Sequence, residues 1–70
     1  MTFQQLQIGD YFRIPGMSDR CIYRKASSLH CNLNTLLQPI RAEIKVTPLT
    51  PAEITNYFAL KQEFLQSLRQ

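Results

Sequence analysis

Cys21, His30 and Cys31 are the residues from which this sequence could most readily build a metal or redox site. A structural zinc site normally has four ligands in two closely spaced pairs, such as Cys-x-x-Cys. His30 and Cys31 are adjacent and Cys21 lies far upstream, so the spacing does not match. A redox site needs a Cys-x-x-Cys pair or an exposed thiolate in positive surroundings, for which Cys31 beside His30 is a weak candidate. We therefore expect no metal site, buried free cysteines and a histidine at the surface.

Catalysis also lacks a recognisable set of residues. Neighbouring residues of a strand point to opposite faces, so His30 and Cys31 cannot form a nucleophile–base pair directly. Gly9 and Gly16 are the only glycines, which excludes a glycine-rich phosphate loop. The carboxylates show no paired motif; they are Asp10, Asp19, Glu43, Glu53 and Glu63. The sequence predicts neither an enzyme nor a bound cofactor.

Basic residues and tyrosines interleave along the first half of the chain, a pattern compatible with nucleic-acid binding. On a small barrel, bases can stack on tyrosines while cations follow the backbone. The residues that would form such a basic face are Tyr11, Arg13, Tyr23, Arg24 and Lys25. Adjacent strand residues alternate between faces, so these side chains need not share one. An ordinary solvated sheet face is the alternative, and nucleic-acid binding is the second of two functional hypotheses.

The first hypothesis is a small non-catalytic accessory or adaptor protein that binds another protein or self-associates. A chain of 70 residues has difficulty covering its own apolar surface, and the C-terminal segment carries a broad apolar arc. The residues expected to meet a partner are Tyr57, Lys61, Phe64 and Leu68. Lys61 is the misfit because it falls inside the arc. A snorkelling side chain explains it, and so does pairing with a carboxylate such as Asp10 or Asp19.

Short antiparallel strands must position the basic residues. Residues 11–14 and 21–25 are rich in strand formers and are separated by a loop that contains Pro15-Gly16, which predicts a hairpin. Residues 29–33 alternate and suggest a third strand. The clearest alternation lies in residues 40–46, which we expect to be the central strand, ended by Thr47-Pro48-Leu49.

A helix must position the partner-binding residues. Thr50-Pro51-Ala52-Glu53 has an N-cap threonine, a proline at the first helical position and a glutamate at the third, so a capping box should start a helix over 51–69. Its apolar arc is broad enough to pack across a sheet. The expected core consists of Phe3, Leu6, Phe12, Ile14, Ile22, Ile40, Ile44, Val46, Ile54, Phe58 and Leu65.

These elements predict a single α+β domain over residues 1–70, mainly β in 1–48 and helical in 51–69. The sheet would be a small antiparallel sheet or an SH3-like partial barrel, followed by the C-terminal amphipathic helix. The net charge of +3 comes from the β part and mildly favours acidic partners. No apolar stretch approaches the roughly 20 residues of a membrane helix, and no signal peptide is evident, so we expect a cytoplasmic protein.

One pattern resembles a known group of proteins. Phe3-x-x-Leu6-x-x-Gly9-Asp10-x-Phe12, followed by Ile22-Tyr23-x-Lys25-x-Ser27, is similar to the opening of small uncharacterised bacterial, cyanobacterial and phage proteins. The resemblance covers roughly the first 28 residues of this chain. It implies a short β-rich, SH3-like domain. It carries no catalytic residue and implies no activity.

Overall fold

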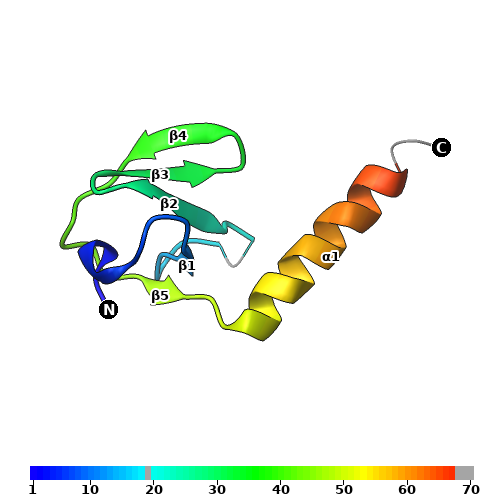
Figure 1. Cartoon of the computed structure of the whole chain (residues 1–70), viewed down its shortest axis with the longest axis horizontal. Helices are drawn as coiled ribbons and strands as arrows, with labels where there is room; N and C mark the ends of the chain where they lie inside the picture. The colour runs from blue at the N-terminus through cyan, green and yellow to red at the C-terminus, as the bar shows by residue number, and fades with distance from the viewer. Residues whose placement is uncertain (19, 68–70) are drawn as a thin grey trace.

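The computed structural model describes the backbone of residues 1–18 and 20–67, and side chains as far as Glu63. A short 3-10 helix η1 (Phe3–Gln5) precedes one antiparallel sheet. The strands are β1 (Tyr11–Arg13), β2 (Tyr23–Ser27), β3 (His30–Leu33), β4 (Leu36–Pro39) and β5 (Thr47–Pro48), in the order β4-β3-β2-β1-β5 (Figure 1). Helix α1 (Pro51–Ser67) follows β5. The predicted small antiparallel sheet with a C-terminal helix is confirmed, whereas the SH3-like barrel is not confirmed.

The predicted first hairpin is present. β1 and β2 are antiparallel, with Tyr11 opposite Arg24 and Phe12 opposite Tyr23. After β1 the chain makes a turn in which the amide of Met17 donates to the carbonyl of Ile14, at 3.1 Å. Gly16 has a φ of +90° in this turn, a conformation that glycine adopts without steric cost.

The expected central strand over 40–46 is wrong. These residues form turns and a single isolated bridge, between Lys45 and Thr2, instead of a strand of the sheet. Their backbone pairs with the N-terminal segment: the amide of Phe3 donates to the carbonyl of Ile44 at 2.9 Å, and that of Val46 donates to the carbonyl of Met1 at 2.8 Å. The alternation thus correctly indicated that every second side chain faces the core. The backbone of this segment, however, pairs with η1 and the residues that flank it, and not with another strand.

The strand at this point in the chain is β5, where the sequence predicted a break. Pro48 has no amide hydrogen, and an edge position is where a sheet tolerates that. β5 pairs with β1 through Phe12 opposite Pro48 and Arg13 opposite Thr47. This pairing matters for the site, because β5 leads directly into α1 and so fixes where the helix starts beside β1.

The core lies between one face of the sheet and the N-terminal segment. Its buried cluster contains Phe3, Leu6, Phe12, Tyr23, Cys31 and Val46. Ile14, Ile40 and Ile44 are partly buried against it, and Ile22 is buried, as expected for these four core candidates. Cys31 is buried, as expected for this cysteine, whereas the expected core left out Tyr23, Lys25 and Leu49, which are also buried.

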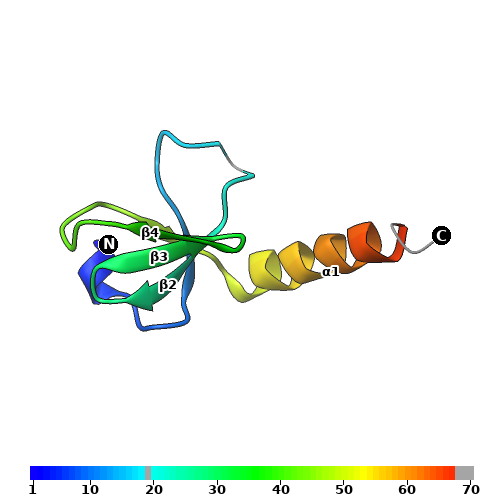
Figure 2. The ribbon, with the colours of Figure 1, turned by 90° about the horizontal axis from the view of Figure 1, so that it is seen from above.

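Helix α1 begins as predicted but does not pack across the sheet. The Thr50 hydroxyl accepts from the Glu53 amide at 3.2 Å, and Glu53 Oε1 accepts from the Thr50 amide at 3.1 Å, so the capping box is confirmed. From there α1 extends away from the sheet (Figures 1 and 2). Ile54 is half-buried, but Phe58 is 44% exposed, so its assignment to the core is wrong. The side chain of Leu65 lies outside the described residues.

Candidate functional site

Two adjoining cavities lie between α1 and the sheet, and together we call them the helix–sheet groove. Ile22 and Tyr57 line both cavities. The larger, about 340 Å³, is also lined by Arg13, Arg20, Glu53, Asn56 and Leu60. The smaller, about 190 Å³, is also lined by Tyr11, Arg24, Asn32, Asn34 and Lys61.

The register of the strands determines which side chains the sheet contributes to this groove. Tyr11 lies opposite Arg24, and Arg24 lies opposite Asn32, so these three residues share one face of β1, β2 and β3. Asn34 follows β3 and adopts a φ of 58°, a left-handed conformation that asparagine tolerates better than most residues. The sheet therefore presents tyrosine, arginine and two carboxamides to the helix.

An ion pair and an aromatic cluster hold the first turns of α1 beside β1. The Arg13 guanidinium donates to the Glu53 carboxylate. The hydrogen bond from the Thr50 amide, with that from Arg13, lowers the pKa of Glu53 below its ordinary value. The Tyr11 ring lies 6.0 Å from that of Tyr57 and 5.6 Å from that of Phe58, centroid to centroid.

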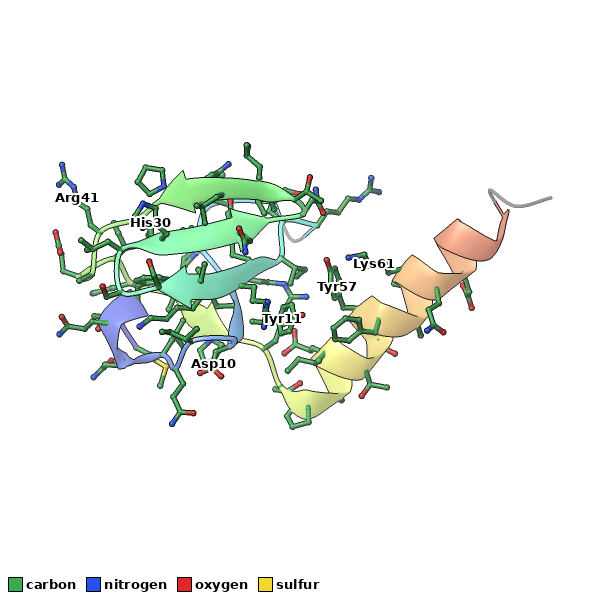
Figure 3. All side chains as sticks on the ribbon, turned by 45° about the horizontal axis from the view of Figure 1, so that its top comes forward. Asp10, Tyr11, His30, Arg41, Tyr57 and Lys61 are labelled. Atoms are coloured by element: carbon green, nitrogen blue, oxygen red, sulfur yellow. The ribbon has the colours of Figure 1, made fainter. Side chains whose placement is uncertain are left out.

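Tyr57 and Lys61 project from α1 toward the sheet, one turn of helix apart (Figure 3). The Lys61 ammonium lies 5.8 Å from the centre of the Tyr57 ring, and the side chain is exposed. This cation thus contacts an aromatic ring of its own helix, and its exposure agrees with the snorkelling side chain that the sequence suggested. Of the other two expected partner-binding residues, the Phe64 side chain and the whole of Leu68 lie outside the described residues.

Two of the expected nucleic-acid contacts are not at the surface. Tyr23 is buried and stacks on Phe12, with ring centroids 5.5 Å apart, and burial raises the pKa of its hydroxyl. Lys25 is 6% exposed; its ammonium donates to the carbonyls of Phe3 at 3.1 Å and Leu6 at 2.7 Å. It also lies 4.7 Å from the centre of the Phe3 ring. Both residues belong to the core, because β2 turns them to the face opposite Arg24.

The structure thus brings together residues from both functional hypotheses. Tyr11, Arg13 and Arg24, expected to touch nucleic acid, line the same groove as Tyr57 and Lys61, expected to touch a protein. Sequence reasoning missed Asn32 and Asn34. The β2–β3 register that brings Asn32 opposite Arg24 could have been guessed from the alternation of residues 29–33, but the position of α1 could not.

The groove is basic. Four of its described lining residues are cations, namely Arg13, Arg20, Arg24 and Lys61. Glu53 is the one carboxylate among the described lining residues, and it is paired with Arg13. An anionic group would therefore be attracted to the part of the groove between Arg24 and Lys61.

Cys21, His30 and Cys31 are not among the described residues that line this groove. Cys31 is buried and Cys21 half-buried, both as free thiols, and burial raises the pKa of Cys31. His30 is exposed, with Nδ1 3.1 Å from the Ser27 hydroxyl. Within the described residues, no three metal-ligating side chains are grouped as a metal ion would require. The described helices are also too short or too polar to cross a membrane.

No protein-family model, curated protein or solved structure matches this chain.

Proposed function

We propose that this chain is a small non-catalytic binding module that uses α1 and the helix–sheet groove to contact another protein. The observation that carries the proposal is the apolar surface left uncovered on the helix. Phe58 is 44% exposed and Leu60 is 66% exposed. A helix that presents apolar side chains beside a groove has the geometry of a known mode of protein recognition.

The position of the helix strengthens this argument. The contacts of α1 with the sheet described above come from Glu53, Tyr57 and Phe58, which lie in its first half. Further along, Leu60 to Glu63 are exposed. A partner could bury this segment without first displacing any of those contacts.

Nucleic-acid binding is supported less well by the geometry. A base needs an accessible ring face, but Tyr23 is buried and Tyr11 already contacts the rings of Tyr57 and Phe58. Arg13 is engaged by Glu53. The predicted basic face is therefore not continuous: Lys25 is buried, Arg13 is paired with Glu53, and Arg24 is exposed.

Site-specific photocrosslinking tests the proposal. A photoreactive amino acid would replace Leu60 in the full chain, and a matched chain would carry it at Ile8, which is also apolar and exposed but lies in the turn before β1. Irradiation in cells that express the chain should give discrete protein adducts from position 60 and not from position 8. Their masses would also separate a second copy of the chain from a different protein.

Two outcomes would contradict the proposal. Equal adducts from both positions would mean that α1 is no preferred surface. If nuclease added before irradiation prevented the adducts from forming, the partner would be held through nucleic acid, and the second hypothesis would be favoured.

A further inference from the structure

The charges of the helix–sheet groove say which kind of protein segment it would take. The smaller cavity has Arg24 on its sheet side and Lys61 on its helix side. Asn32 in β3 and Asn34 just after β3 line it as well. Arg24 and Lys61 are exposed. Glu53, the one carboxylate among the described lining residues, lines the other cavity and is paired with Arg13.

Apolar surface lies immediately beside these cations. Ile22 and Tyr57 line both cavities, and Leu60 lines the larger one. A ligand that satisfies the whole groove therefore needs acidic groups for Arg24 and Lys61 and apolar groups for Tyr57 and Leu60. An extended or helical peptide that alternates the two chemistries provides both.

We infer that the helix–sheet groove binds an acidic amphipathic segment of a partner protein. This inference rests on the proposed function and adds the chemistry of the partner. Carboxylates of the segment pair with Arg24 and Lys61, and its apolar side chains cover Leu60 and the exposed part of Phe58. The side-chain amides of Asn32 and Asn34 can donate to backbone carbonyls of the segment.

Charge also argues against a second copy of this chain as the occupant. The chain has a net charge of +3, so two copies repel each other. Of its acids, Glu53 is paired with Arg13, and the side chain of Asp10 accepts from the Gln7 amide at 2.9 Å. A partner with its own excess of carboxylates complements the groove better.

The test is an unbiased selection of short random peptides displayed on phage, with the full chain as bait. Three baits would be compared: the unchanged chain, Arg24→Gln with Lys61→Gln, and Arg41→Gln with Lys45→Gln. The second pair is a matched control, because Arg41 and Lys45 are exposed and removing them changes the net charge equally. Arg41 lies at the end of the sheet away from Lys61 (Figure 3).

Peptides selected on the unchanged chain should be enriched in aspartate and glutamate interleaved with leucine, phenylalanine or similar residues. A selected peptide, labelled and followed by fluorescence anisotropy, should bind the Arg24/Lys61 variant roughly tenfold more weakly, because two charge pairs are lost. Its affinity for the Arg41/Lys45 variant should stay within about twofold. Added salt should weaken binding to the unchanged chain more than to the Arg24/Lys61 variant.

The outcomes separate this inference from the proposed function. Selection of neutral or basic peptides, or equal losses in the two double variants, would overturn the acidic partner. A failed selection would overturn it as well. In each case, crosslinking from position 60 could still succeed, and protein binding through α1 would stand. If a thymidine oligonucleotide competed for Arg24 and Lys61 with higher affinity than any selected peptide, nucleic acid would replace protein as the ligand.

Discussion

The two faces of the sheet carry almost the same kinds of residue in opposite surroundings. The inner face has an aromatic pair, Phe12 and Tyr23, and a cation, Lys25, all buried. The outer face has an aromatic residue, Tyr11, and a cation, Arg24, which line the helix–sheet groove. Residue type alone therefore does not tell a core position from a binding position in this protein.

The two faces differ in how completely other parts of the chain cover them. The N-terminal segment closes the inner face, and its carbonyls accept hydrogen bonds from the buried Lys25 ammonium, which has no carboxylate partner among the residues that the structure describes. The outer face is covered at one end, where the first turns of α1 pack on Tyr11. We conclude that the inner face supplies stability, and that the outer face has groups left to meet a ligand.

Phe12→Ala should have the largest effect, because Phe12 is fully buried and packs against both Phe3 and Tyr23. We expect a loss of about 3–5 kcal/mol in the free energy of unfolding, as is usual for phenylalanine in a core. Tyr11→Ala, at the neighbouring position, should lower the free energy of unfolding by about 1 kcal/mol, because it removes mainly the aromatic contacts of Tyr11 with α1. Urea denaturation followed by circular dichroism would measure both.

A domain this small could be left unfolded by Phe12→Ala, so Phe12→Leu provides a graded second variant. Leucine keeps part of the buried volume, and its loss should be intermediate. Equal losses for the Phe12 and Tyr11 variants would break the comparison between the faces.

Lys25→Met and Arg24→Met compare two adjacent cations, one on each face of the sheet. Methionine keeps most of the apolar stem but removes the donor from the carbonyls of Phe3 and Leu6, which should cost about 2–3 kcal/mol. Arg24→Met should change stability by less than about 0.5 kcal/mol, because Arg24 is exposed. Hydrogen exchange should show the loss first at η1. A Lys25 variant as stable as the Arg24 variant would mean that the ammonium does not anchor the N-terminal segment.

Local patterns in the sequence were sufficient for much of this architecture. The capping box around Thr50 and Glu53 and the β1–β2 hairpin depend on residues close in the chain, and both are present. Phe3, Leu6 and Phe12 were recognisable as core residues for the same reason. The opening motif, from Phe3 to Phe12, supplies three of these buried positions.

The errors arose where the partner of a segment is distant in the chain. Alternation in 40–46 indicates an extended, half-buried segment but does not say whether a strand or η1 lies beside it. Lys25 looked like a surface cation because the carbonyls that satisfy it belong to residues about 20 positions away. The groove itself depends on the direction in which α1 leaves the sheet. That direction is set by the contacts of Arg13 with Glu53 and of Tyr11 with Tyr57, which sequence periodicity does not report.

The smallest expected effect concerns Glu53, which caps the start of α1 and pairs with Arg13 of β1. Its pKa is lowered in the folded chain by hydrogen bonds from the Thr50 amide and Arg13. A carboxyl group whose folded pKa lies below its unfolded value stabilises the fold fully above the unfolded pKa, and this stabilisation is lost as the pH falls through the folded pKa. The cap and the Arg13 contact should therefore persist at neutral pH and weaken as the pH falls below the ordinary glutamate value of 4.5.

The backbone amide of Thr50, followed by NMR during an acid titration, reports this change directly because it donates to Glu53. Its chemical shift should move with a midpoint below the ordinary glutamate value of 4.5. In Glu53→Gln the titration of this amide should vanish, while the threonine hydroxyl can still cap the helix. The contacts of Tyr11 with Tyr57 should loosen over the same pH range while the Phe12–Tyr23 stack does not change. If both aromatic pairs responded together, the helix side and the inner face would be one cooperative unit, and the groove could not adjust to a ligand without unfolding the core.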